Sequence, residues 1–272
     1  MYLVSHTVWS LLGASAYLGA IANSADGVLD IRMVFPRQNE TYAPMEKFPI
    51  IFALQNANLA KHLQPLIQLD VLNGSMTMLD KVNERMFDLQ WANYSSEPYL
   101  LYAFMDFETE GPLKILWAAW WRHCDESGDE VRIISNSSDK LWVDFDIKEG
   151  AQKADLVAAT AKEEKCPAHV GVAINVMDKT HNVPEPLSGQ NKQYGTCAVV
   201  APSSPTPTSN PCRVKIDKAT VESMEANELD RRCRRLNPPA NCPEEDQATQ
   251  QLAVGGGATL ATALGAAAFL LA

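Results

Sequence analysis

The alternation of apolar and polar residues along most of the chain predicts a series of short β-strands. Apolar side chains recur at every second position, which is the period of a strand with one buried face. Turn-forming residues separate these runs: Pro36 ends the first, and the Asn73-Gly74 dipeptide ends the third. The predicted strands cover residues 29–35, 50–54, 67–71, 87–91, 99–105, 113–122, 131–135, 142–148 and 170–176. So many short strands without long helices predict an all-β fold, an antiparallel immunoglobulin-like β-sandwich.

A helical period is found only toward the end of the chain. Residues 217–236 place apolar side chains near one face, and Pro238-Pro239 follows, so we expect a short amphipathic helix there. Its apolar face would consist of Val221, Met224, Leu229, Cys233 and Leu236. The periodicity of residues 151–165 fits a helix and irregular structure equally well.

Two segments without Asp, Glu, Lys or Arg, residues 1–25 and 247–272, enclose all formal charges. The first has an apolar run that ends in Ala20-Ile21-Ala22, a pattern that signal peptidase would cut before Asn23. A membrane anchor is the alternative, although the run is short for a span. The second ends in an apolar tail with no basic residue after it, which favours a GPI-attachment signal over a transmembrane helix. We expect attachment at Ala248, with residues 255–257 as a weaker rival site.

These features divide the chain into five parts. They are a signal peptide at residues 1–22, a β-sandwich domain at 23–200, a segment rich in Pro, Ser and Thr at 201–211, a cysteine-containing helical segment at 212–248, and a tail at 249–272 that is removed on GPI attachment.

The six cysteines indicate disulfide bonds, because an even number in an exported chain is typical of oxidised proteins. Three lie before the segment 201–211 and three lie after it, so complete pairing requires at least one bridge across that segment. The connectivity stays open. The cysteines are Cys124, Cys166, Cys197, Cys212, Cys233 and Cys242.

Four Asn-x-Ser/Thr motifs agree with an exported chain. We expect N-glycans on these asparagines, and the alternative at each is an unmodified asparagine in a turn. The four acceptors are Asn39, Asn73, Asn93 and Asn136.

The charge balance excludes one class of partner. The chain has 23 Lys and Arg against 33 Asp and Glu, a formal net charge of -10. A nucleic-acid-binding protein would need a basic face to replace the counterions of the phosphates. We therefore expect no nucleic-acid partner and no electrostatic docking on anionic lipid. Contact with a lipid bilayer would come through the GPI anchor instead.

Two tryptophans have both a functional and a structural interpretation. Strand alternation places Trp120 beside Lys114 and Arg122, and Trp142 beside Asp144, on the outward face of their strands. Exposed indoles there could stack on the sugar rings of a wall polysaccharide. The alternative is that a covering segment buries both tryptophans, because large aromatic side chains are mostly buried in folded proteins.

The residue patterns of known catalytic centres are largely missing. Cys166-Pro-Ala-His169 has the spacing of half a zinc site, but in an oxidising compartment Cys166 is expected in a disulfide. The carboxylate pairs Asp144/Asp146 and Asp125/Glu126 would suit a glycosidase only if the fold raised the pKa of one member. We therefore expect a non-enzymatic protein without metal or cofactor.

The motifs at Leu29–Pro44 and Phe48–Ala57 are similar to the start of a fungal domain family of unknown function, found in secreted and often GPI-anchored surface proteins. Further matches are residues 154–161 with Cys166, Gly195-Thr-Cys197 and Asn210-Pro-Cys212. The resemblance implies a fungal cell-surface protein and supplies no catalytic residues. The basic cluster Arg231–Arg235 departs from the pattern of this family. Its two interpretations are a proteolytic processing site and the solvated end of a helix.

Two functional hypotheses follow. The first is a non-enzymatic GPI-anchored glycoprotein of the cell surface or wall, with a structural or adhesive role. The second is a carbohydrate-binding or carbohydrate-active module that acts on wall polysaccharide through Trp120 and Trp142.

Overall fold

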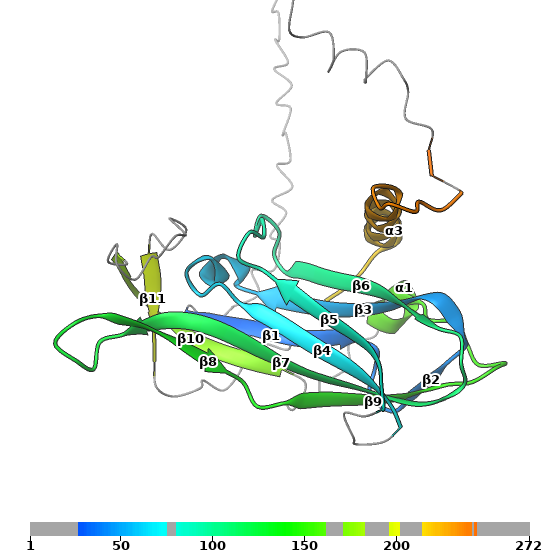
Figure 1. Ribbon diagram of the computed structural model, residues 1–272, viewed down its shortest axis with the longest axis horizontal. Helices are drawn as coiled ribbons and strands as arrows, with labels where there is room; N and C mark the ends of the chain where they lie inside the picture. The colour runs from blue at the N-terminus through cyan, green and yellow to red at the C-terminus, as the bar shows by residue number, and fades with distance from the viewer. Residues whose placement is uncertain are drawn as a thin grey trace, which may run out of the picture. The chain divides into compact units, whose positions relative to one another are not determined.

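A computed structural model describes residues 27–74, 80–161, 171–182, 196–201, 214–240 and 242–243 (Figure 1). Most of these residues lie in strands, which confirms the prediction of a mostly β protein. The strands are β1 (Val28–Phe35), β2 (Glu40–Tyr42), β3 (Met45–Gln55), β4 (Leu66–Asn73), β5 (Lys81–Asp88), β6 (Tyr99–Phe107), β7 (Gly111–Asp125), β8 (Arg132–Ser137), β9 (Leu141–Ile147), β10 (Gly171–Asn182) and β11 (Thr196–Val200). The helices are the 3₁₀ helix η1 (Ala57–His62), α1 (Leu156–Ala161) and α3 (Lys218–Cys233).

The strands pair in the order β2-β9-β7-β11-β10-β1-β3-β6, with β4 and β8 also on β7 and β5 on β4. Most pairs are antiparallel as predicted, but β2 with β9 and β11 with β7 are parallel. β2 and β11 were not expected from the sequence. Both are short, and each pairs with a strand distant in sequence, so local alternation carries little information about them.

The fourth predicted strand was misplaced. Residues 87–91 were expected to form it, whereas β5 runs from Lys81 to Asp88 and pairs along the length of β4. The strand ends at Asp88 because the Leu89 amide donates to the carbonyl of Pro65 and the chain then turns, leaving Trp91 66% exposed. The alternation that continues to Trp91 is therefore not a strand pattern.

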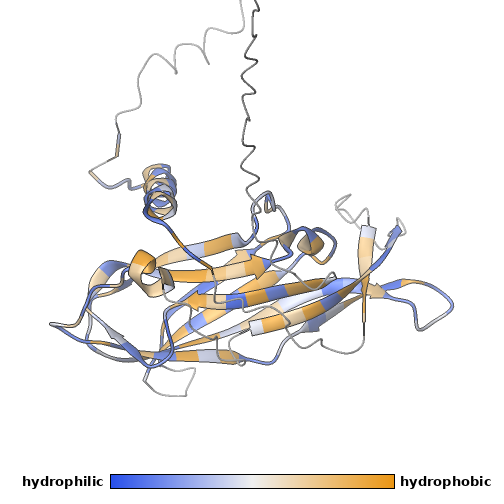
Figure 2. Ribbon diagram, turned by 180° about the vertical axis from the view of Figure 1, so that it is seen from behind, coloured by the Kyte–Doolittle hydropathy of each residue, from blue (hydrophilic) through white to orange (hydrophobic). Residues whose placement is uncertain are grey.

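Aromatic rings link strands that do not pair with one another. Phe52 of β3 lies 5.0 Å from Trp117 of β7, and Phe48 of β3 lies 5.3 Å from Phe145 of β9, between ring centroids. All four side chains are almost fully buried. The apolar residues of the strands form this core, as the hydropathy colouring of the ribbon shows (Figure 2).

A charged pair is also buried, on the face of β1 opposite to that of Met33, the strand partner of Phe52. Asp30 and Arg32 of β1 are each 4% exposed, and Arg32 Nε donates to Asp30 Oδ1 at 2.8 Å. Arg32 is opposite Gly171 of β10, where a Cβ atom would lie 2.5 Å from its Cγ. Burial raises the pKa of Asp30, against the opposing effect of the Arg32 guanidinium. Glycine at position 171 thus leaves room for the arginine side chain.

The undecided stretch 151–165 contains a short helix. α1 begins after Asp155, whose carboxylate accepts a hydrogen bond from the amide of Ala158 at 3.0 Å, as an N-cap residue does. Thr160 at its end is buried and accepts a hydrogen bond from the Ile216 amide at 2.9 Å. This contact ties the residues before α3 to the part of the chain that contains the strands.

The predicted amphipathic helix is confirmed as α3. Asp217 precedes it and accepts the amide hydrogen of Thr220 at 2.7 Å; hydrogen bonds from Thr220 lower the pKa of Asp217. The expected extension to Leu236 is wrong, because the helix ends at Cys233 and Leu236 is 98% exposed. The chain divides into two units, residues 1–221 and 222–272, and the boundary falls inside α3.

Candidate functional site

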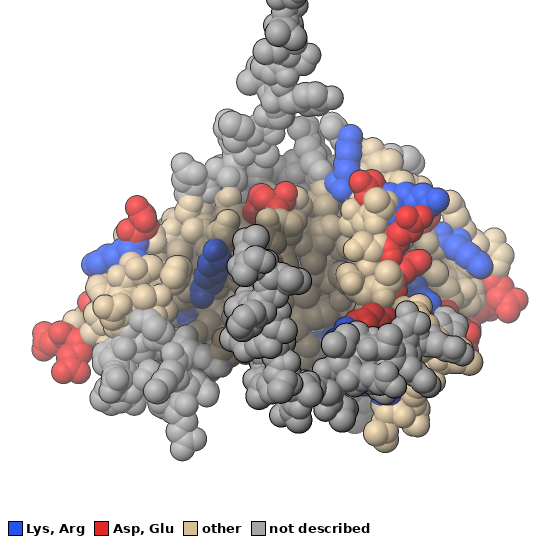
Figure 3. All heavy atoms as spheres, turned by 90° about the horizontal axis from the view of Figure 1, so that it is seen from above, with Lys and Arg blue, Asp and Glu red and all other residues tan. Residues whose placement is uncertain are grey.

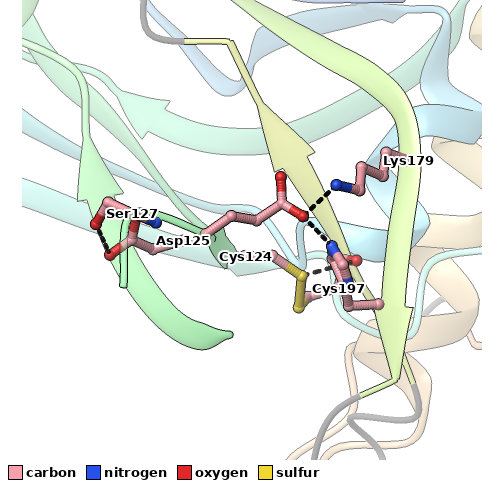
Figure 4. Close-up of polar contacts among 7 residues, drawn as sticks. Cys124, Asp125, Ser127, Lys179 and Cys197 are labelled. Atoms are coloured by element: carbon pink, nitrogen blue, oxygen red, sulfur yellow. Dashed lines mark hydrogen bonds and ion pairs between the residues drawn. A yellow bond between two sulfur atoms is a disulfide. The ribbon is translucent and has the colours of Figure 1, made fainter. Parts of the chain in front are cut away.

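One candidate site lies at the end of β7, where a disulfide joins β7 to β11. Cys124 is bonded to Cys197, with 5.5 Å between their Cα atoms, and it is also the strand partner of Val199. Both sulfurs belong to a small buried cluster with Val199. Figure 4 shows this bridge beside Lys179 of β10.

The two acids after Cys124 are held by neighbouring groups. Asp125 accepts hydrogen bonds from the amide and the hydroxyl of Ser127, and these bonds lower its pKa. Glu126 contacts Lys179 and His181 (Figure 4). Both contacts lower the pKa of Glu126, and the contact with Lys179 has the larger effect. A glycosidase acid would need a raised pKa. The arrangement therefore gives the pair Asp125/Glu126 no support as a catalytic dyad.

The second carboxylate pair is also engaged on the surface. Asp144 forms an ion pair with Lys114 and accepts a hydrogen bond from Gln38 Nε2 at 3.1 Å, and Asp146 is exposed. Neither carboxylate lies in the apolar surroundings that a glycosidase acid needs. The pair Asp144/Asp146 thus gains no support as an acid and base either.

A cavity of about 350 Å³ opens beside the disulfide. Strands β7, β8, β10 and β11 supply its walls, with Trp121, His123, Asp125, Asn136, Asn175 and Val199 among the lining residues. His123 is only 7% exposed, and no described residue is a hydrogen-bond partner of its Nδ1. Burial lowers the pKa of His123, so its imidazole is neutral near pH 7. The cavity therefore combines an indole, a neutral imidazole and amide side chains.

The predicted sugar-stacking residues point away from the cavity: Trp120 of β7 faces opposite to Trp121, and Trp142 of β9 shares the face of Trp120. Trp142 of β9 is 46% exposed, and Lys114 Nζ lies 6.0 Å from its ring centroid. Trp120 of β7 is half-buried. Trp142 is opposite Leu116, four residues from Trp120 along β7, so the two indoles are separated by about 14 Å at strand spacings. The structure therefore places both side chains outward but does not bring them into contact.

All four sequon asparagines are exposed. Asn39 lies in a turn with φ of 61°, Asn73 is the last residue of β4, Asn93 follows β5, and Asn136 lies on β8 opposite Trp121. Each is accessible to a glycosyltransferase, which requires an exposed acceptor.

The four described cysteines form two disulfides, Cys124–Cys197 and Cys233–Cys242. Each bridge stays on its own side of segment 201–211. Cys166, Cys212, His169 and the expected GPI site Ala248 lie outside the described residues, so the bridge expected across this segment stays a prediction.

The described residues contain no group of three or more His, Cys, Asp or Glu side chains placed to hold a metal ion. None of their helices is both long enough and apolar enough to cross a bilayer.

Comparison with known families gives one match. The family model described as a domain of unknown function, DUF7136, matches residues 24–242. The chain belongs to the DUF7136 family. Neither the comparison with curated proteins nor that with solved structures found a match. Membership of DUF7136 assigns no activity, so the functional argument depends on this chain's own residues.

Sequence reasoning missed the cavity of this DUF7136 protein. The predicted strand 113–122 contains Trp121, whereas the predicted strand 131–135 stops one residue before Asn136, and alternation within a strand does not give the register between two strands. The pairing of these two residues follows only from the register of β7 with β8. The hydrophobic run around Trp121 indicated a buried strand, whereas the sequon of Asn136 indicated an exposed turn. Neither pattern indicated that Trp121 and Asn136 lie opposite each other.

Proposed function

We propose that this protein is a non-enzymatic glycoprotein of the cell surface, exported, oxidised and held by a GPI anchor. The observation that carries the proposal is the exposure of all four sequon asparagines. The pairing of every described cysteine in a disulfide agrees with an oxidising compartment. The DUF7136 match at residues 24–242 also fits within the interval expected for the mature chain, 23–248.

Expression of the full chain in a fungal host tests the anchor. We expect phosphatidylinositol-specific phospholipase C to release the protein from intact cells, because a GPI-anchored chain is held only through its lipid. The released form should end near Ala248 and should lose mass on treatment with a peptide N-glycosidase. A version that stops at residue 246 is the control and should appear in the medium without the enzyme. Retention in membranes after verified anchor cleavage would contradict the proposal.

A second candidate function, binding of wall polysaccharide, is favoured by the exposure of Trp142. An indole that is half exposed and flanked by the Lys114–Asp144 ion pair offers an apolar face to a sugar ring and polar groups to its hydroxyls. Trp120, about 14 Å away at strand spacings, would contact a later residue of an extended polymer. On the described part of the surface in Figure 3, Lys and Arg side chains lie among Asp and Glu side chains.

Replacement of Trp142 with Ala tests this second function. We expect retention of the glycosylated domain on insoluble chitin, β-glucan or mannan to fall by about tenfold, since stacking on one aromatic side chain contributes about 1 kcal/mol or more. Trp91→Ala is the matched control, because Trp91 is 66% exposed and lies outside the strands. Equal retention of both variants, or no retention of the unaltered protein on any of the three, would exclude the binding function.

We also propose an immunoglobulin-like sandwich as the architecture. The ring contacts of β3 with β7 and β9 support it, because facing sheets of a sandwich interdigitate their inner side chains.

A further inference from the structure

We propose that the first sugar of the glycan on Asn136 packs against Trp121 and occupies the cavity beside the Cys124–Cys197 disulfide. The inference rests on the proposed glycosylation and goes beyond it, because it makes this glycan a part of the folded structure. The occupant is fixed by covalent attachment, since Asn136 itself lines the cavity.

The register of β7 with β8 brings the acceptor and the indole together. Trp121 and Asn136 are directly opposite each other in an antiparallel pair. Side chains in such a pair point to the same face, with Cβ atoms about 5 Å apart. A sugar bonded to the Asn136 amide therefore starts within reach of the Trp121 ring.

The walls of the cavity offer the contacts that an N-acetylhexosamine needs. Trp121 and Val199 supply apolar surface for the ring face, and Asn175 and Asp125 supply polar atoms for the hydroxyl and acetamido groups. The Asn175 side chain lines the cavity and carries both an amide donor and an amide acceptor. The volume of about 350 Å³ lies at the small end of the range of about 300–1,000 Å³ for ligand pockets, which suits one or two sugar rings.

Two of the other acceptors lack such a partner and serve as internal references. Asn93 lies in the loop between β5 and β6, and Asn39 lies in the turn before β2. Neither is opposite an aromatic residue in a strand pair. Glycans on Asn39 and Asn93 should therefore extend freely into solvent.

The test is site-specific digestion of the folded glycoprotein with an endoglycosidase, followed by mass spectrometry of the glycopeptides. We expect the Asn136 glycan to be cleaved about tenfold more slowly than the Asn93 glycan, because the enzyme reaches it only when the sugar leaves the indole. Trp121→Leu should abolish this difference while keeping an apolar side chain in the wall. Trp120→Leu is the matched control: it removes an indole from the opposite face of β7 and should leave the protection intact.

Thermal unfolding supplies a second readout that does not depend on the endoglycosidase. Asn136→Gln should lower the Tm of the unaltered protein but have a smaller effect in the Trp121→Leu background, and Asn93→Gln should show no such coupling. Equal cleavage rates at Asn136 and Asn93, or additive effects of Asn136→Gln and Trp121→Leu on Tm, would overturn the proposal. Absence of a glycan from Asn136 alone would also overturn it, whereas absence from all four acceptors would refute the proposed function itself.

Discussion

Replacing Asp30 with Ala is expected to lower the free energy of unfolding by about 3–5 kcal/mol. The substitution leaves the Arg32 guanidinium 96% buried without the carboxylate that accepts its hydrogen bonds. A buried charge without a partner keeps its full desolvation cost, which is why removal of one member of a buried pair is so destabilising. Chemical denaturation followed by tryptophan fluorescence measures the change, because Trp117 is buried in the folded protein and becomes exposed on unfolding.

The matched control replaces both members of the pair. Asp30→Leu combined with Arg32→Met removes both charges and fills the space with apolar atoms, so it should be much less destabilising than Asp30→Ala. A loss below about 1 kcal/mol for Asp30→Ala would contradict the argument.

The pH dependence supplies a separate check on Asp30. Burial raises its pKa above 3.8, so the folded state binds this proton more tightly than the unfolded state. The contribution of the group to stability is therefore complete below pH 3.8 and is lost as the pH rises through the folded pKa. The Asp30→Ala variant should lack this pH-dependent contribution to the free energy of unfolding, which denaturation at a series of pH values measures.

Replacing Cys124 and Cys197 together with Ser is expected to lower the free energy of unfolding by about 4 kcal/mol. The bridge closes a loop of 73 residues, and loss of the cross-link gives that loop its freedom in the unfolded state. For a domain of this size the Tm should fall by about 10 °C, which scanning calorimetry can measure.

The second disulfide is the control for that experiment. Cys233 and Cys242 are 9 residues apart, so their bridge restricts the unfolded chain less. Both cysteines lie in the unit 222–272, after the strands. Replacing them with Ser should leave the main calorimetric transition almost unchanged, and a larger shift than for Cys124 and Cys197 would refute the loop-entropy argument.

The positions of the strands could be predicted because their alternation is local. In β9, Val143, Phe145 and Ile147 are buried, and the residues between them are half-buried or exposed, as the sequence indicated. The same reasoning placed Trp117 inside and Trp120 and Trp142 outward. Alternation failed where the partner decides the structure, as at β5, which is largely exposed and is defined by its pairing with β4.

The buried pair Asp30–Arg32 shows a second limit. One-sided alternation in β1 would leave Asp30 and Arg32 exposed, yet all eight residues of β1 are buried. β3 and β10 pair with the two edges of β1, and the burial of successive residues shows that both its faces are covered as well, so the strand has no solvent-exposed side. No pattern within residues 28–35 carries this information.

The bridge between Cys124 and Cys197 has a consequence for biosynthesis. At about 5–20 residues per second, a ribosome needs about 4 to 15 s to add the 73 residues that separate them. Cys166 is made earlier than Cys197, so during synthesis the first thiol that Cys124 can meet is not its partner in the folded protein. Correct oxidation must therefore wait for β11 or pass through an exchange catalysed by an isomerase.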